Sequence, residues 1–84
     1  MAYKLSNMVR MRDIQRLARK IAEEYRPLRI TLFGSYAYGT PTEHSDVDLL
    51  VLMKGRRVHD RAVQIRLAIN FDFPVDLLVR SPEE

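Results

Sequence analysis

Residues 34–51 contain the groups in this 84-residue chain that are best suited to chemistry. One apolar run ends in Gly34-Ser35, and a second begins with Asp46-Val47-Asp48. Because strand side chains alternate between two faces, Asp46 and Asp48 are predicted to project from the same face. Two adjacent carboxylates repel each other unless a hard cation lies between them, and Mg²⁺ typically takes one or two carboxylates plus substrate phosphate oxygens. The stretch is therefore interpreted as a candidate site for metal and nucleotide chemistry.

The glycine turn supplies the other half of the expected site. Gly34 and Gly39 allow tight turns and a close approach of the backbone to a ligand. The next residues, 35–38, are predicted to form a short helix whose first amide groups point at an anion such as phosphate. An ordinary turn between elements is the alternative. The two tyrosines of this helix are interpreted as packing residues rather than as platforms for a nucleobase.

A third acid, Asp76, lies in a later apolar segment that is predicted to be a strand. Alone it is typical of a solvent-facing residue on an edge strand. Together with the two upstream acids, we expect it to be the third metal ligand. The competing acid is Asp72, but its loop position favours capping or solvation. His44 and His59 are the only histidines, and both are interpreted as surface residues.

The combination of these features resembles the signature of the polymerase-β-like nucleotidyltransferase superfamily, in which Gly-Ser is followed after ten residues by Asp-x-Asp. Gly39, Ser45 and Asp76 extend the agreement. Since the chain is little longer than this core, it is most similar to the minimal nucleotidyltransferases, small prokaryotic proteins commonly paired as antitoxins with a helical HEPN-type toxin. Without the full pattern, the paired acids would be interpreted as charges that protect an edge strand from aggregation.

The resemblance implies an enzyme that moves a nucleoside monophosphate, AMP from ATP, to a hydroxyl group. The implied catalytic residues, which are also the ligands of two Mg²⁺ ions, are Asp46, Asp48 and Asp76. The implied nucleotide-binding residues are Gly34, Ser35, Tyr36 and Gly39. The implied acceptor is a tyrosine of a HEPN toxin, so that the chain acts as an antitoxin. A non-catalytic antitoxin that only binds its partner and a free-standing small-molecule nucleotidyltransferase stay open as alternatives.

Length and composition limit the other choices. So short a chain predicts one domain, residues 1–84, with an open site that favours self-association or a helical partner. The absence of cysteine excludes disulfides and thiolate zinc sites. Neither a signal-peptide core nor a membrane span is visible, so a cytoplasmic location is expected. The net charge of +3 lacks the aromatic-interleaved basic strip of single-strand binders, and nucleic-acid binding is not expected.

Apolar periodicity predicts the elements that must position these residues. The predicted helices are residues 7–25, 35–38 and 58–70, and the predicted strands are residues 28–33, 45–53 and 75–79. Residues 81–84 are expected to be a frayed tail. For the site to form, the first strand must run antiparallel to the other two, which are parallel and joined by a helical crossover. The expected class is α/β of the α+β type: the nucleotidyltransferase fold, with a small mixed three-stranded sheet, flanking helices and the order α-β-α-β-α-β.

Overall fold

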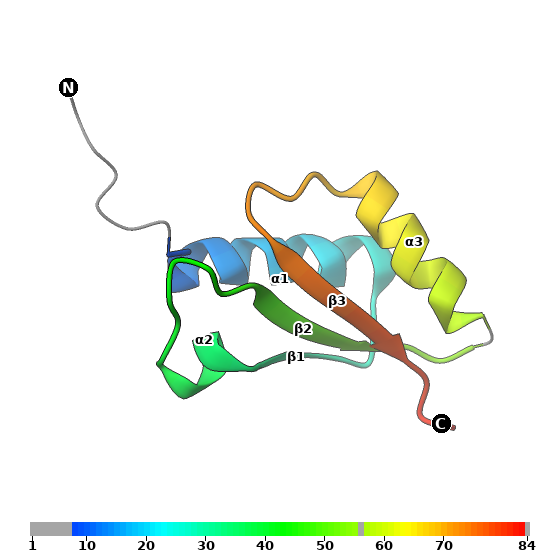
Figure 1. The fold of residues 1–84 in the computed structure, drawn as a ribbon. Helices are drawn as coiled ribbons and strands as arrows, with labels where there is room; N and C mark the ends of the chain where they lie inside the picture. Colours follow the sequence, from blue (N-terminus) through cyan, green and yellow to red (C-terminus); the bar gives the residue numbers. More distant parts are fainter. Residues whose placement is uncertain (1–7, 56, 84) are drawn as a thin grey trace.

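The computed structural model describes residues 8–55 and 57–83. Of residues 58 and 59 it describes the backbone only. Its elements follow the predicted order (Figure 1). They are α1 (Met11–Tyr25), β1 (Arg29–Phe33), α2 (Ser35–Tyr38), β2 (Val47–Leu52), α3 (Val58–Ala68) and β3 (Val75–Arg80). The prediction that His59 is a surface residue falls outside the described side chains. No helix among the described residues is long and apolar enough to cross a membrane.

The sheet has the predicted mixed topology, with β2 between the other two strands. β1 pairs with β2 in the antiparallel sense, and β3 pairs with β2 in the parallel sense. The parallel pair is joined by α3, as expected because parallel neighbours require a crossover connection. This arrangement brings the end of β1 and the starts of β2 and β3 to the same end of the sheet.

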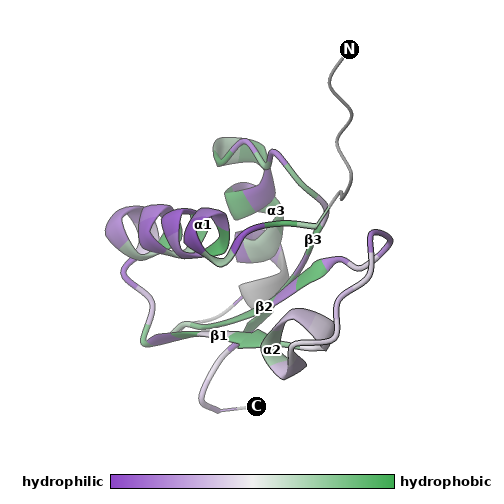
Figure 2. Ribbon diagram, turned by 90° about the vertical axis from the view of Figure 1, so that its left-hand side faces the viewer, coloured by the Kyte–Doolittle hydropathy of each residue, from purple (hydrophilic) through white to green (hydrophobic). Residues whose placement is uncertain are grey.

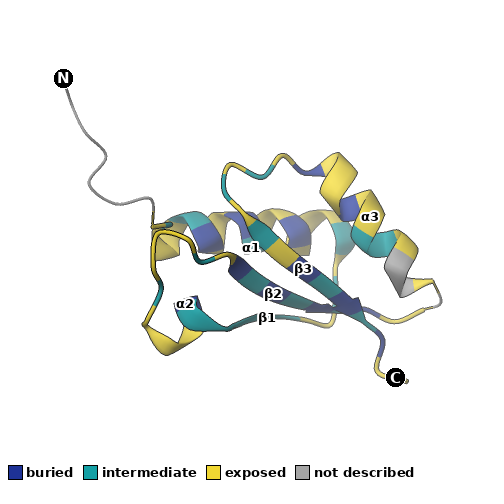
Figure 3. Cartoon of the chain, in the orientation of Figure 1, coloured by how far each residue is buried: buried dark blue, intermediate teal, exposed yellow. Residues whose placement is uncertain are grey.

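The two longer helices cover one face of the sheet (Figure 2). The alternation of side chains in β2 sets this layering, since its odd-numbered residues are buried and its even-numbered residues are partly exposed (Figure 3). The core combines this buried face with apolar residues of α1 and with the end of α3. Its members include Ile14, Leu17, Ile21, Val47, Leu49, Val51, Ile65, Ile69, Leu77 and Val79.

The boundaries of α1 differ from the prediction at the N-terminal side. The helix begins at Met11 rather than at residue 7, which lies outside the described part of the chain. Arg10 has the extended conformation of a residue that precedes a helix, with φ −80° and ψ 146°. At the other end, Arg26 adopts the left-handed conformation and donates its N–H to the Ala22 carbonyl, as in a helix C-cap, before Pro27.

The other elements also end at slightly different places from those predicted. β2 begins at Val47 rather than at Ser45, because Ser45 is held in a turn, and it ends at Leu52. α3 ends at Ala68, two residues before the predicted end, since Ile69 is already extended. β3 continues to Arg80, whose carbonyl accepts from the Met53 N–H at 2.9 Å. The predicted frayed tail is wrong for its first residue, because Ser81 is buried.

Candidate active site

Two of the three predicted acids lie side by side at one end of the sheet. Asp48 is the register partner of Phe33 in β1 and of Asp76 in β3. Since register partners share a face, Asp48 and Asp76 project from the face opposite α1 and α3. Asp46 lies one residue before β2 and is exposed. The strand topology therefore brings together two acids, Asp48 and Asp76, that are 28 residues apart in the sequence.

Asp76 and Asp46 act electrostatically on Asp48. The pKa of Asp48 is raised above its ordinary value of 3.8, first by burial and then by the negative charges of Asp76 and Asp46. Both causes act in the same direction because burial and a neighbouring anion each disfavour the charged form of a carboxyl group. The deprotonated form of Asp48 is therefore disfavoured in this environment.

The chemistry of these donors fits a hard divalent cation, which is bound by carboxylate oxygens and would offset the repulsion at Asp48. The side chains are not drawn together into a closed cluster, however. Among the side chains that the structure describes, no three histidine, aspartate or glutamate residues form a group that could hold a metal ion. The assignment of Asp46, Asp48 and Asp76 as metal ligands stays a prediction.

Gly34 lies directly against the Asp48 carboxylate. It has φ 74° and ψ −158°, a backbone conformation that residues other than glycine rarely adopt. A Cβ atom built on it would overlap the Asp48 carboxylate oxygen Oδ2. The glycine is therefore needed both for its backbone angles and for the space it leaves, which gives a physical reason for the Gly34-Ser35 turn.

The predicted short helix after this turn is present as α2. The N–H groups of Ala37 and Tyr38 donate hydrogen bonds to the Gly34 carbonyl at 3.0 and 3.1 Å. Those of Ser35 and Tyr36, the first two helical residues, have no acceptor within the helix, as is usual at a helix start. The helix ends at Gly39, which has φ 78° and open space where a Cβ would lie.

The two tyrosines of α2 have different environments. Tyr36 is buried, and its hydroxyl oxygen accepts a 2.9 Å hydrogen bond from the backbone N–H of Val9. Its ring belongs to the core, so packing is its role and base stacking by its side chain is excluded in this conformation. Tyr38 is 81% exposed. The prediction that both tyrosines pack under the loop is thus confirmed for Tyr36 and wrong for Tyr38.

A hydrogen-bonded turn before Asp46 was not expected from the sequence. The Thr42 N–H donates to Ser45 Oγ at 2.8 Å, and the Ser45 N–H donates to the Thr42 carbonyl at 3.1 Å. The Thr42 hydroxyl also accepts from the N–H of His44 at 3.2 Å. This turn orders the loop immediately before the first acid. The Thr-x-x-Ser pattern was its only signal in the sequence.

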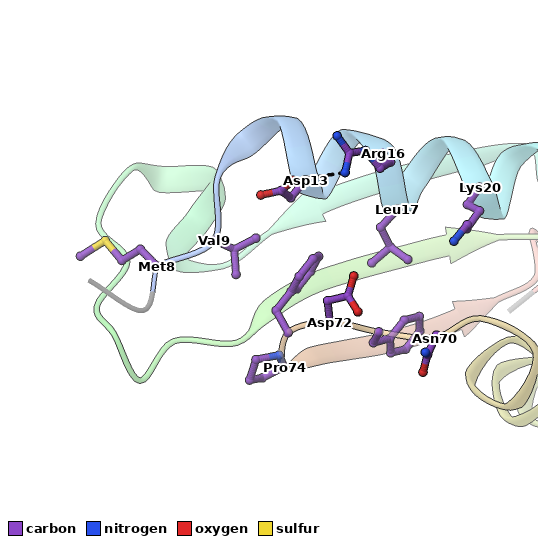
Figure 4. A pocket seen from close by; sticks show the side chains of 11 residues that line it. Met8, Val9, Asp13, Arg16, Leu17, Lys20, Asn70, Asp72 and Pro74 are labelled. Carbon is purple, nitrogen blue, oxygen red and sulfur yellow. Dashed lines mark ion pairs between the residues drawn. The ribbon is translucent and has the colours of Figure 1, made fainter. Parts of the chain in front are cut away.

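The two residues that are not predicted to belong to the site, His44 and Asp72, are both exposed. His44 is exposed and is 3.6 Å from Glu43. Asp72 is exposed and lines a cavity of about 450 Å³ between α1 and residues 70–74 (Figure 4). The α1 rim of this cavity carries the Asp13 and Arg16 ion pair, at 3.8 Å. None of the three site acids lines it, because it opens on the side of the sheet that the helices cover.

Known proteins with related sequences were found in Methanocaldococcus jannaschii. The "Putative protein adenylyltransferase MJ1305" is 37% identical over 71 residues, which are 81% of this chain and 47% of that protein. The "Putative protein adenylyltransferase MJ0141" is 38% identical over 52 residues, which are 61% of this chain and 52% of that protein. The chain thus spans about half the length of these relatives.

The fold also has a solved counterpart. The crystal structure of a putative nucleotidyltransferase from Sulfolobus solfataricus superimposes with a TM-score of 0.66 and 27% sequence identity, over 87% of this chain and 68% of that one. This similarity confirms the predicted fold class. Residues 14–84 match the family described as "Nucleotidyltransferase domain". The match contains both the glycine turn and the three acids, and with the two adenylyltransferase relatives it shows that the chain belongs to the nucleotidyltransferase domain family, among the minimal nucleotidyltransferases.

Proposed function

We propose that this chain is a protein adenylyltransferase that moves AMP from ATP to a hydroxyl group of a partner protein. The observation that carries the proposal is the placement of Asp48 beside Asp76 and against Gly34, at the end of the sheet where the glycine turn also lies. The names of the two archaeal relatives support the type of transfer. The nucleotide, the acceptor and the activity of the whole protein are parts of the proposal.

The roles of the chain's own residues follow from charge. Asp46, Asp48 and Asp76 would hold divalent cations, Mg²⁺ in the proposal, and bound cations of this kind stabilise the charge that develops on transferring phosphates. Ser35 and the first amides of α2 supply hydrogen-bond donors for the phosphate chain of ATP. Gly34 keeps the backbone close enough for both groups to act on one substrate. Gly39 ends α2 and turns the chain away from this region.

The acceptor is proposed to be a protein because the site is open. Asp48 and Asp76 lie on the face of the sheet that neither α1 nor α3 covers (Figure 2), and none of the three acids lines the cavity between α1 and residues 70–74. A docked protein could bring its own hydroxyl group to this surface, where its oxygen would attack the α-phosphorus of ATP and pyrophosphate would leave. A tyrosine of a helical HEPN-type toxin, with this chain as its antitoxin, is the proposed acceptor.

Co-expression with the product of a neighbouring gene tests the transfer. Intact-protein mass spectrometry after incubation with ATP and Mg²⁺ should show the neighbour heavier by one or more AMP groups, each less one water. Asp46→Ala should prevent the addition through loss of a cation ligand. Asp72→Ala is the matched control, because it removes an exposed acid from the loop before β3 and should leave the transfer intact.

A binding-only antitoxin is the second candidate, and it is favoured by the lack of a closed three-acid group among the described residues. In that case the partner is inhibited equally well by wild type and Asp46→Ala, and no mass is added to it. That result would replace the transferase proposal with a binding one.

A further inference from the structure

The edge of the sheet formed by β3 is capped by side chains. Arg66 Nη2 donates to the Val75 carbonyl at 3.2 Å. Arg80 Nη1 donates to the Val79 carbonyl at 2.9 Å. Both carbonyls point away from β2, because β2 bonds to the alternate residues of this segment, the carbonyls of Pro74 and Arg80 among them. Arginine side chains thus occupy backbone acceptors at which another strand would otherwise pair.

The opposite edge, formed by β1, has no such cap among the described residues. The N–H groups of Val47 and Met53 bond toward β3, so the even-numbered residues of β2 bond toward β1. Their register partners in β1 are odd-numbered, which leaves the backbone N–H and C=O groups of Ile30 and Leu32 pointing outward. No hydrogen bond outside the sheet involves these two residues in the described part of the chain. An edge strand without a proline, a bulge or a cap is a template for a further strand.

We propose that β1 pairs with β1 of a second copy of this chain, in the antiparallel sense, about a two-fold axis at Thr31. In this register Ile30 of each copy lies opposite Leu32 of the other. Each of these two pairs exchanges both of its backbone hydrogen bonds. The four resulting bonds use every outward N–H and C=O group of the two residues in both copies.

The backbone disfavours the neighbouring registers. A shift of two residues in one direction would replace one partner by Leu28, whose N–H already donates to the Leu52 carbonyl at 2.7 Å. A shift in the other direction would replace it by Gly34, whose carbonyl already accepts two N–H groups of α2. A shift of one residue would set side chains on opposite faces of the joined sheet. Self-pairing of β1 therefore selects the register that is centred on Thr31.

The charges agree with the same register. Arg29 of one copy lies opposite Phe33 of the other, so the row of Phe33, Asp48 and Asp76 continues into a basic residue. Arg29 is exposed and makes no ion pair with a described residue. Two strand spacings, about 10 Å, separate its backbone from that of Asp48 in the other copy, and the long arginine side chain lies over the Phe33 ring toward this acid. The second copy thus brings a positive charge to an acidic row that has none of its own.

A shallow groove beside β1 provides a complement for the side chains. It has a volume of about 380 Å³, lies between α1 and the start of β1, and is lined by Ala18, Ala22, Leu28 and Ile30 among others. Ile30 and Leu32 are on the helix-covered side of the sheet, because both pack against the core. In the proposed register Leu32 of the second copy lies beside Ile30, at this groove. The small alanine side chains of α1 leave room for it.

The pairing gives the second copy a part in the nucleotide site, a consequence that rests on the proposed function. Each Arg29 guanidinium reaches the acidic end of the other copy, where its planar set of donors suits a phosphate of ATP. ATP with Mg²⁺ should therefore strengthen the dimer, since it binds residues of both copies. The interface contains a strand of only five residues from each copy, so association should depend on protein concentration.

Disulfide cross-linking tests the register without any ligand. The chain has no cysteine, so Thr31→Cys introduces a single thiol. It lies opposite its own equivalent in a non-hydrogen-bonded pair, with about 4.5 Å between the Cα atoms, which is within the range for a disulfide. Oxidised glutathione should convert Thr31→Cys to a covalent dimer on a non-reducing gel. Leu67→Cys is the control, because it places a thiol at an 83% exposed position of α3, away from the edge.

A mixture of two variants tests the same register at its ends. Arg29→Cys and Phe33→Cys should each fail to cross-link alone, since each thiol is about 13 Å from its equivalent along the strands. An equal mixture of the two should form a covalent heterodimer. Sedimentation equilibrium of the wild type should show an average mass that rises from 9.9 kDa toward twice that value with concentration. Arg29→Glu should weaken this association about tenfold, whereas Arg12→Glu, the same charge change on exposed α1, should not.

The cross-linked Thr31→Cys dimer separates self-pairing from the nucleotide site. Adding Arg29→Ala to it should weaken Mg²⁺-dependent ATP binding about tenfold, and adding Arg12→Ala should not. A wild type that is monomeric at every concentration, with Thr31→Cys no faster to cross-link than Leu67→Cys, would overturn the proposal and leave the β1 edge to a strand of another protein. Equal ATP affinities of the Arg29→Ala and Arg12→Ala dimers would refute the contribution of Arg29. A cross-linked dimer that binds no ATP would confirm the pairing and contradict the proposed function.

Discussion

Gly34 and Asp48 are in such close contact that no other residue type fits at position 34 without displacing the carboxylate. The two residues are 14 positions apart in the sequence and meet because the antiparallel pairing of β1 and β2 sets Phe33 beside Asp48. The turn that is expected to hold phosphate and the acid that is expected to hold a cation are therefore one structural unit. A substitution at Gly34 should therefore displace the Asp48 carboxylate.

Gly34→Ala should lower both stability and nucleotide binding. The new Cβ overlaps Asp48 Oδ2, and φ 74° with ψ −158° is a strained conformation for alanine, which costs about 1 to 3 kcal/mol. Urea unfolding measures the first effect, and titration calorimetry with ATP and Mg²⁺ measures the second.

Gly39→Ala is the matched control for that experiment. Gly39 has a similar φ of 78°, but no atom lies within 4 Å of the place where a Cβ would be. The loss should be limited to about 1 kcal/mol of backbone strain, with ATP binding retained. Equal effects of the two substitutions on binding would show that contact with Asp48 is not what position 34 requires.

Asp48→Asn should stabilise the metal-free protein, and more so as the pH rises. The pKa of Asp48 is raised in the folded state, so folding favours its protonated form. The stability from this group is fully present below the unfolded pKa and is lost as the pH rises through the folded pKa. The asparagine variant has no such loss, and the difference in unfolding free energy should grow upward from about pH 4.

Urea unfolding of both proteins over a pH series in the presence of EDTA checks this expectation. Added Mg²⁺ should stabilise the wild type but not Asp48→Asn if the acid is a cation ligand. A difference between the two proteins that does not vary with pH would mean that Asp48 has the same pKa folded and unfolded.

Tyr36→Phe should cost stability without affecting the nucleotide. The substitution removes the oxygen that accepts from the Val9 N–H, and a partly buried hydrogen bond of this kind contributes about 1 kcal/mol. Tyr38→Phe, at an exposed position, should change stability by less than about 0.5 kcal/mol. Thermal unfolding and ATP titration distinguish the effects, and weaker ATP binding by a fully stable Tyr36→Phe protein would favour a direct role in the site.

Ser45→Ala should weaken cation binding more than stability. Ser45 Oγ accepts from the Thr42 N–H, and its loss frees the turn that precedes Asp46. Since the bond is exposed, the stability change should stay below about 1 kcal/mol. Thr40→Ala is a suitable control because the Thr40 side chain makes no hydrogen bond to the described residues. A Mn²⁺ titration should show weaker binding for Ser45→Ala only, and equal affinities would remove the turn from the site.

Most of the fold could be predicted because local patterns and the site's requirements agree. The alternation of β2 and the helical period of α1 define the two layers, and the need to gather Gly34 with Asp48 and Asp76 defines the strand directions. The start of β2 could not be predicted, because Thr42 and Ser45 replace strand pairing with side-chain hydrogen bonds. Packing of Tyr36 could be predicted, but its hydrogen bond with the Val9 N–H, 27 residues away, could not, because no local pattern shows it. The spacing of the three acids in the sequence also does not show whether their side chains converge.

Titration calorimetry of ATP tests whether Asp46, Asp48 and Asp76 form one site for ATP and a divalent cation. Wild type should bind ATP in the presence of Mg²⁺ and lose this binding in EDTA. The double variant Asp46→Asn with Asp48→Asn should not bind, whereas Asp72→Asn should bind as wild type does. Retention of Mg²⁺-dependent ATP binding by a folded double variant would show that these acids do not hold the cation and the nucleotide.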